Sequence, residues 1–90
     1  MPQRAVPIVN RLGMHARAAA KFVGLASQFQ SDVLVSRNGR EVNGKSIMGV
    51  MMLAAAKGTE VKIRTQGADD AEQALDALCD LIAHRFGEET

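Results

Sequence analysis

The chain has 90 residues, and a chain of this length is expected to fold as one domain, residues 1–90. Eleven Lys and Arg residues against ten Asp and Glu residues leave a formal net charge of +1. This balance argues against nucleic acid as the main partner, because binding to phosphate backbones needs clustered cations. A small core leaves little room for an enclosed active site, so a shallow surface site is expected.

Cysteine usage and hydropathy indicate a cytoplasmic protein. The single cysteine, Cys79, excludes an internal disulfide framework and fits a reducing compartment. The N-terminus shows no basic segment followed by an apolar stretch, so no secretory signal is expected. The most apolar run, residues 47–56, is too short to span a bilayer.

The chain begins with a predicted strand and a predicted helix. Residues 4–9 are typical of a strand, and Pro7 should place that strand at a sheet edge because proline has no N–H. Residues 16–29 are rich in alanine and predict a helix. One face of this helix carries Ala19, Val23 and Ala26.

A β-hairpin follows, with strands at residues 32–36 and 40–42. The connection between these strands contains Asn38-Gly39, a strong hairpin signal because both residues tolerate a positive φ. Ser46 is then placed to cap a second helix, at about residues 47–55.

The last part of the chain predicts a strand and a helix. Residues 60–65 alternate, with Val61 and Ile63 inward, and Asp69 with Glu72 resembles a capping box. Apolar residues then recur at helical spacing, with Gly87 as the stop. These residues are Ala71, Leu75, Leu78, Ile82 and Phe86.

The predicted order βαββαβα is typical of a two-layer α+β domain with an antiparallel sheet. The commonest fold with a βαββαβ core is ferredoxin-like, and it places the first strand inside the sheet. Pro7 favours an arrangement with that strand at the edge.

His15 is the main candidate for chemistry. It stands between a loop and a predicted helix start, where free N–H groups and the helix dipole favour a neutral imidazole and would hold an attached anion. Arg17 adds a guanidinium that can pair with phosphate oxygens. A nucleophile beside an anion site suits phosphoryl transfer, although spacing alone also fits two ordinary polar residues at a helix end. No second acid–base group is evident near His15.

Three motifs resemble the HPr family of phosphocarrier proteins of the bacterial sugar phosphotransferase system. They are Asn10-Arg11-Leu12, Gly13-Met14-His15-Ala16-Arg17 and Lys45-Ser46-Ile47-Met48-Gly49-Val50-Met51. Chain length and element order match as well. The resemblance implies an open-faced β-sandwich, with a four-stranded antiparallel sheet ordered 1-4-2-3 and three helices on one face.

The resemblance also implies the site. His15 would be phosphorylated through Nδ1, and Arg17 together with the backbone N–H groups of Ala16 and Arg17 would bind the phosphoryl group. Enzyme I, charged by phosphoenolpyruvate, would be the donor, and IIA domains would be the acceptors. The protein would be a stoichiometric carrier rather than an enzyme, a monomer, with no cofactor. Ala18 departs from the proline common in the family.

The second helix carries two apolar faces. Val50, Leu53 and Ala54 form one, and Ile47, Met48, Met51 and Met52 form the other. A helix on a small sheet cannot bury both faces, so the methionine-rich face is expected to be exposed or to meet a partner, unless the core is thicker. The family resemblance favours exposure, with a docking surface made of Ala20, Lys21, Gly24, Ile47, Met48 and Met51.

Ser46 carries two compatible interpretations. As an N-cap it would start the second helix, and as a regulatory phosphosite it would be a substrate of HPr kinase/phosphorylase, which recognises such a segment in part of the family. Cys79 is interpreted as a buried small hydrophobe and His84 as an exposed residue at a helix end. No metal-ligand spacing is present.

Two rival functions stay open. One keeps the family but places the carrier in a nitrogen-related regulatory phosphotransferase chain. The other is a non-covalent ligand-binding or regulatory βαββαβ module, in which His15 would be replaceable without loss of function.

Overall fold

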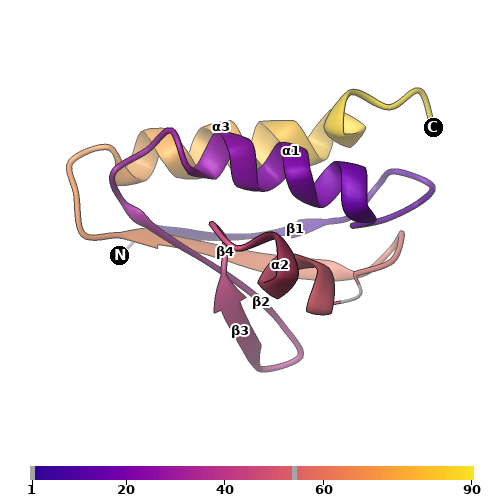
Figure 1. The fold of residues 1–90 in the computed structure, drawn as a ribbon, viewed down its shortest axis with the longest axis horizontal. Coiled ribbons are helices and arrows are strands. Elements are labelled where there is room, and N and C mark those ends of the chain that lie inside the picture. Colours follow the sequence, from indigo (N-terminus) through magenta and orange to yellow (C-terminus); the bar gives the residue numbers. More distant parts are fainter. Residues whose placement is uncertain (1, 54) are drawn as a thin grey trace.

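The computed structural model describes residues 2–53 and 55–90. The elements follow the predicted order βαββαβα, with one short left-handed turn, η1, after the last helix (Figure 1). They are β1 (Gln3–Pro7), α1 (Ala16–Ala26), β2 (Asp32–Arg37), β3 (Arg40–Asn43), α2 (Ile47–Met52), β4 (Glu60–Gln66), α3 (Ala71–Ala83) and η1 (Arg85–Gly87).

The four strands form one sheet in the order β1-β4-β2-β3, and every neighbouring pair is antiparallel. The helices lie on one side of this sheet, and α1 and α3 run side by side across it (Figure 1). Strand β1 is an edge strand, as Pro7 predicted, and Pro7 itself pairs with Glu60. The edge position excludes the ferredoxin-like alternative and confirms the open-faced sandwich.

The hydrophobic core lies between the sheet and the helices. Alternate residues of β4 point inward, so Val61 and Ile63 are fully buried, as predicted. The predicted apolar faces of α1 and α3 are buried against them, and Cys79 is buried among them. Phe86 is buried as well, but it lies beyond the helix in which it was predicted, because α3 ends at Ala83 and not at Gly87. Val50 and Leu53 join the core from α2, whereas Ala54, predicted on the same face, lies outside the described residues.

The hairpin prediction is confirmed, with Asn38 at φ 52° and Gly39 at φ 80° between β2 and β3. The two helices beside it are shorter than predicted. Helix α1 ends at Ala26 and α2 ends at Met52, where residues 29 and 55 were expected. In both cases the amides after the helix bond to carbonyls three residues back, which tightens the last turn and ends the α-helix.

The predicted capping box at the start of α3 is wrong. Asp70, not Asp69, is the N-cap residue, and its side chain makes no cap hydrogen bond. Its carboxylate instead accepts hydrogen bonds from Ser31 Oγ at 2.6 Å, Gln30 N at 2.8 Å and Ser31 N at 3.0 Å. These bonds lower the pKa of Asp70, with the Ser31 hydroxyl as the largest cause. Asp70 therefore ties the segment before β2 to the start of α3.

Asp70 should make stability depend on acid pH. Because its pKa is lower in the folded chain than the ordinary 3.8, its contribution is complete above that value and is lost as the pH falls through the folded pKa. We therefore expect the free energy of unfolding, measured with urea from neutral pH into the acid range, to fall less with decreasing pH in Asp70→Asn than in wild type. Asp69→Asn, at an exposed neighbouring carboxylate, is the control and should follow wild type. An unchanged acid loss in Asp70→Asn would contradict this role.

Candidate active site around His15

His15 is held at the start of α1 by a pinned loop. It is the N-cap residue, with φ −77° and ψ 178°. Met14 N donates to Ala55 O at 2.8 Å, and Gly13 has φ +69°, where a Cβ would lie 2.6 Å from Ala55 O. Only glycine tolerates both the backbone conformation and this close approach. The loop before α1 is thus fixed against the segment after α2, and the position of His15 follows from it.

The first turn of α1 offers backbone donors beside His15. The first helical hydrogen bond runs from Ala19 N to His15 O at 2.8 Å. Within residues 2–53 and 55–90, the N–H groups of Ala16, Arg17 and Ala18 have no hydrogen-bond acceptor. Such groups, with the helix dipole, favour an anion at this end. Ala18 keeps an N–H that proline would lack, and its side chain is fully buried in the core.

The carboxylate of Glu88, which the sequence analysis did not identify, contacts His15. Oε2 of Glu88 pairs with Nε2 of His15, and Oε1 of Glu88 accepts from Asn10 Nδ2 at 3.0 Å. Asn10 is fully buried and donates through the same Nδ2 to Gly13 O at 2.8 Å. Hydrogen bonds from these two side chains lower the pKa of Glu88, and the bond from Asn10 is the larger cause, followed by the bond from His15. The expectation that no acid–base group lies near His15 was therefore wrong.

The Glu88 contact assigns different tasks to the two ring nitrogens. A carboxylate at Nε2 favours a proton on Nε2, so the neutral ring carries its lone pair on Nδ1. Nδ1 is then the ring nitrogen with a free lone pair, which is the chemical requirement for a nucleophile, and the Glu88 carboxylate lies at the opposite nitrogen.

The site is shallow and open, as expected for a chain of this size. A recess of about 450 Å³ is lined by Leu12, His15, Ala16, Arg17, Glu88 and Thr90. The His15 side chain is 27% exposed and that of Glu88 16%. Arg17 is exposed, and its guanidinium makes no hydrogen bond within the described part of the chain. The guanidinium is accordingly available to a phosphate.

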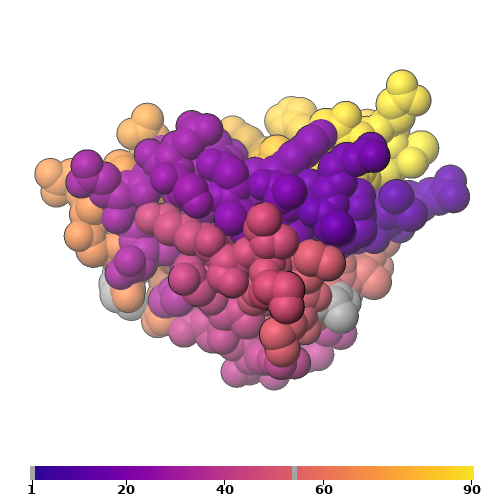
Figure 2. All heavy atoms as spheres, in the orientation of Figure 1, coloured from indigo at the N-terminus to yellow at the C-terminus, as the bar shows by residue number. Residues whose placement is uncertain are grey.

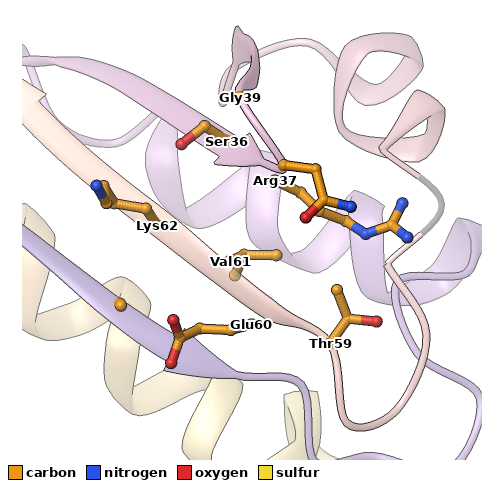
Figure 3. A pocket seen from close by; sticks show the side chains of 9 residues that line it. Ser36, Arg37, Gly39, Thr59, Glu60, Val61 and Lys62 are labelled. Carbon is orange, nitrogen blue, oxygen red and sulfur yellow. The ribbon is translucent and has the colours of Figure 1, made fainter.

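A second recess, of about 490 Å³, lies on the uncovered face of the sheet (Figure 3). It is a polar groove, with Ser36 and Lys62 on neighbouring strands and Thr59 at its rim (Figure 3). None of the residues predicted for the functional site lines it. This groove therefore shares no lining residue with the recess around His15.

The methionine-rich face of α2 is exposed, which confirms the sequence interpretation and excludes a thicker core. Met48 is 73% exposed and Leu12, in the loop before α1, is 64% exposed. Figure 2 shows that loop, α1 and α2 meeting on one face of the molecule. All six predicted docking residues are exposed on these helices; they are Ala20, Lys21, Gly24, Ile47, Met48 and Met51.

Ser46 is the N-cap of α2, which confirms the structural interpretation of this residue. Its backbone is extended, with φ −115° and ψ 116°, and Oγ accepts from Gly49 N at 3.1 Å. The neighbouring Lys45 donates from Nζ to Phe29 O at 2.7 Å. Ser46 thus sits half-buried at the edge of the exposed apolar face, where a change at its hydroxyl affects the helix start and the face together.

The remaining candidates take no part in this site. His84 is exposed at the end of α3, and its Nδ1 lies 2.7 Å from Asp80 O. No group of three potential metal ligands occurs among residues 2–53 and 55–90. Within those same ranges, none of the helices has the length and apolar character needed to cross a membrane.

Known proteins resemble this chain over its whole length. Residues 2–84 match the family described as the PTS HPr component phosphorylation site. The phosphocarrier protein HPr of Cupriavidus necator is 59% identical over 88 residues, which cover 98% of each chain. The crystal structure of HPr-C-His from Thermoanaerobacter tengcongensis has a TM-score of 0.95 at 47% identity, and the match covers 100% of both chains. An HPr dimer from the same organism gives a TM-score of 0.77 at 46% identity, covering 98% of this chain and 100% of that one.

Proposed function

Because this chain belongs to the HPr family of phosphocarrier proteins of the phosphotransferase system, we propose that His15 accepts a phosphoryl group from phospho-enzyme I and passes it to IIA domains of sugar permeases. One observation carries the proposal. Nδ1 of His15 faces no protein partner in the described part of the chain, while Glu88 holds Nε2 and free N–H groups of α1 lie beside it.

The transfer step follows from this geometry. The lone pair on Nδ1 of His15 attacks the phosphorus atom carried by enzyme I, and the N–P bond forms as the bond to the donor's leaving group breaks. The leaving group keeps that electron pair. The proton on Nε2 stays in place, and the Glu88 carboxylate offsets the positive charge that the ring acquires. Transfer to a IIA domain is the same step in reverse, with the acceptor as the nucleophile.

The phosphoryl oxygens have two sources of stabilisation on this chain. The N–H groups of Ala16 and Arg17 stand at the helix start, and the Arg17 guanidinium is free to form charge-assisted bonds. Phosphoryl transfer depends mainly on positioning and charge stabilisation, and the donor and acceptor proteins supply the rest. The chain therefore acts as a stoichiometric carrier rather than a stand-alone catalyst.

The exposed face beside His15 is the proposed docking surface for enzyme I and for IIA domains. It combines the exposed side of α1, at Ala20, Lys21 and Gly24, with Ile47, Met48 and Met51 of α2. Methionine side chains adapt to differently shaped partners, which suits a carrier that must bind a donor and several acceptors in turn. The carrier is proposed to work in the cytoplasm as a monomer.

Ser46 is proposed as a regulatory phosphosite for HPr kinase/phosphorylase at the edge of this docking surface. A phosphate there would stand at a helix start, where backbone N–H groups tolerate it. It would also place charge beside Ile47 and Met48, which a docked partner has to cover. Phosphorylation of Ser46 would then weaken docking without unfolding the helix.

Two variants of Ser46 should separate its roles. Ser46→Ala removes the cap to Gly49 N and should cost about 0.5–2 kcal/mol of stability. Ser46→Asp keeps a cap acceptor but adds charge at the docking surface, and it should weaken enzyme I binding by about one to two orders of magnitude through a desolvation cost of about 1–3 kcal/mol. Thermal melts and titrations with enzyme I at moderate salt measure the two effects. Wild-type affinity in Ser46→Asp would remove the physical basis of the regulatory proposal.

The rival functions make different predictions for the same mixture. Incubation with enzyme I and phosphoenolpyruvate should raise the intact mass of the chain by one phosphoryl group. A non-covalent module would stay at its original mass. A carrier of a nitrogen-related phosphotransferase chain would be labelled, but it would pass the group to a nitrogen-type IIA domain and not to the IIA domains of sugar permeases. Adding each type of acceptor to the labelled protein and measuring its mass again distinguishes the two pathways.

A further inference from the structure

The chain leaves α3 through an unusual turn. Arg85, Phe86 and Gly87 have φ values of 58°, 54° and 79°, so three consecutive residues occupy the left-handed region. Helices commonly end with one such residue, usually glycine. Two non-glycine residues in this region are unfavourable, because Cβ crowds the backbone, and the conformation persists only where other contacts hold it.

The contact that holds the turn from outside comes from Lys21 of α1. Its Nζ donates to Phe86 O at 2.7 Å, and the Phe86 ring is buried, with 1% of its surface exposed. Within the turn, Gly87 N donates to His84 O at 3.0 Å and Glu88 N donates to Arg85 O at 2.8 Å. A lysine on one helix therefore fastens the backbone that follows another.

The residues after the turn run to the active site. Glu88 is extended, with φ −80° and ψ 151°, and its carboxylate reaches His15 and Asn10. Thr90 O then accepts from Arg11 N at 2.9 Å. In Figure 1 this terminal segment lies on the side of the molecule that carries the loop before α1. The segment is thus fastened at Phe86 and at Thr90, and Glu88 lies between the two points.

We propose that Lys21 is a positioning residue for His15, which acts by holding Phe86 O and so placing the Glu88 carboxylate on Nε2. The inference rests on the proposed role of His15 as the phosphorylated residue. It adds that Lys21, by placing Glu88 on Nε2, determines that Nδ1 is the reactive nitrogen. Glu88 lies outside the helices and strands, and a carboxylate on an irregular segment is placed only as firmly as that segment is held. Lys21 supplies a tie that holds the segment, in addition to its place in the docking surface.

The test uses the free protein, so that docking does not enter. Proton NMR of wild type and of Lys21→Met measures solvent exchange of two protons, the Nε2 proton of His15 and the amide proton of Arg11. Both should exchange about tenfold faster in Lys21→Met, since a hydrogen bond of ordinary strength that restrained the segment is gone. Lys21→Arg keeps a cationic donor and should restore slow exchange. Lys45→Met is the matched control, because it removes an equal charge and an equal 2.7 Å bond to a carbonyl elsewhere.

A double variant separates positioning from a direct charge effect. In a Glu88→Ala background the Nε2 proton of His15 should already exchange fast, and adding Lys21→Met should change it no further. Equal exchange in wild type and Lys21→Met would overturn the inference. A change at His15 alone, with the Arg11 amide unaffected, would overturn it as well, because it would show a through-space effect of the lysine charge. Slow Nε2 exchange in a wild-type protein that enzyme I does not label would refute the proposed function, while the tie between Lys21 and Glu88 would stand.

Discussion

We expect His15→Ala to take up no phosphoryl group from enzyme I and phosphoenolpyruvate, while wild type is labelled to one group per chain. The reason is that Nδ1 of His15 is the ring nitrogen that Glu88 leaves free beside the start of α1. The label on wild type should be lost in acid and survive in base, as expected for a phosphoramidate. Intact-mass measurement before and after acid treatment checks both points.

The other histidine of the chain supplies the control for this variant. His84 is exposed and lies at a helix end, with Asp80 O near its Nδ1. His84→Ala should be labelled as wild type is. Labelling of His15→Ala to the wild-type extent would place the acceptor elsewhere and contradict the account.

Arg17→Ala should slow transfer by about one to two orders of magnitude and leave the fold intact. The guanidinium is exposed and contributes no hydrogen bond to the described part of the chain, so its loss costs the folded state little. A charge-assisted contact to the phosphoryl oxygens is worth roughly 1.5–3 kcal/mol. If that contact is strongest in the transition state, the rate falls by the corresponding factor.

Rapid-quench kinetics with enzyme I, and separately with a IIA domain, measure the Arg17 effect. Arg40→Ala is the matched control, because Arg40 is exposed on β3 and no part of the recess around His15. Transfer at the wild-type rate with both partners would remove Arg17 from the site. Loss of binding with an unchanged transfer step would reassign Arg17 to docking.

The sheet and its order were predictable because local rules and packing agree. Pro7 cannot donate a hydrogen bond within the sheet, and β1 lies at the edge. Val61 and Ile63 alternate with charged residues, and they point into the core. The methionine-rich face of α2 was predictable for a related reason, since one helix on a small sheet buries one face only.

The ends of the helices were less predictable. The alanine-rich helix was predicted to continue to residue 29, but the amides of Gln28 and Phe29 bond to carbonyls three residues back, and α1 ends at Ala26. At α3 the expected partner of the helix start was its own N-cap carboxylate. The Asp70 carboxylate instead accepts a hydrogen bond from Ser31, 39 positions away in sequence, and a rule based on local spacing cannot predict such a contact.

The same limit explains the part of the site that was missed. His15 and Arg17 were evident because a helix start and its neighbours are local features of sequence. Glu88 is separated from His15 by 73 positions, and it reaches the ring only through the left-handed turn at residues 85–87. That turn contradicts the ordinary preferences of Arg85 and Phe86, so sequence reasoning predicts a plain helical stop at Gly87 and no return to His15.

The most direct test of the account is the position of the phosphoryl group itself. Nitrogen-15 and phosphorus-31 NMR of the protein after reaction with enzyme I and phosphoenolpyruvate identifies the atom that bears it. We expect phosphorus on Nδ1 of His15, with the proton retained on Nε2 beside Glu88. Phosphorus on Nε2, or on any residue other than His15, would contradict it.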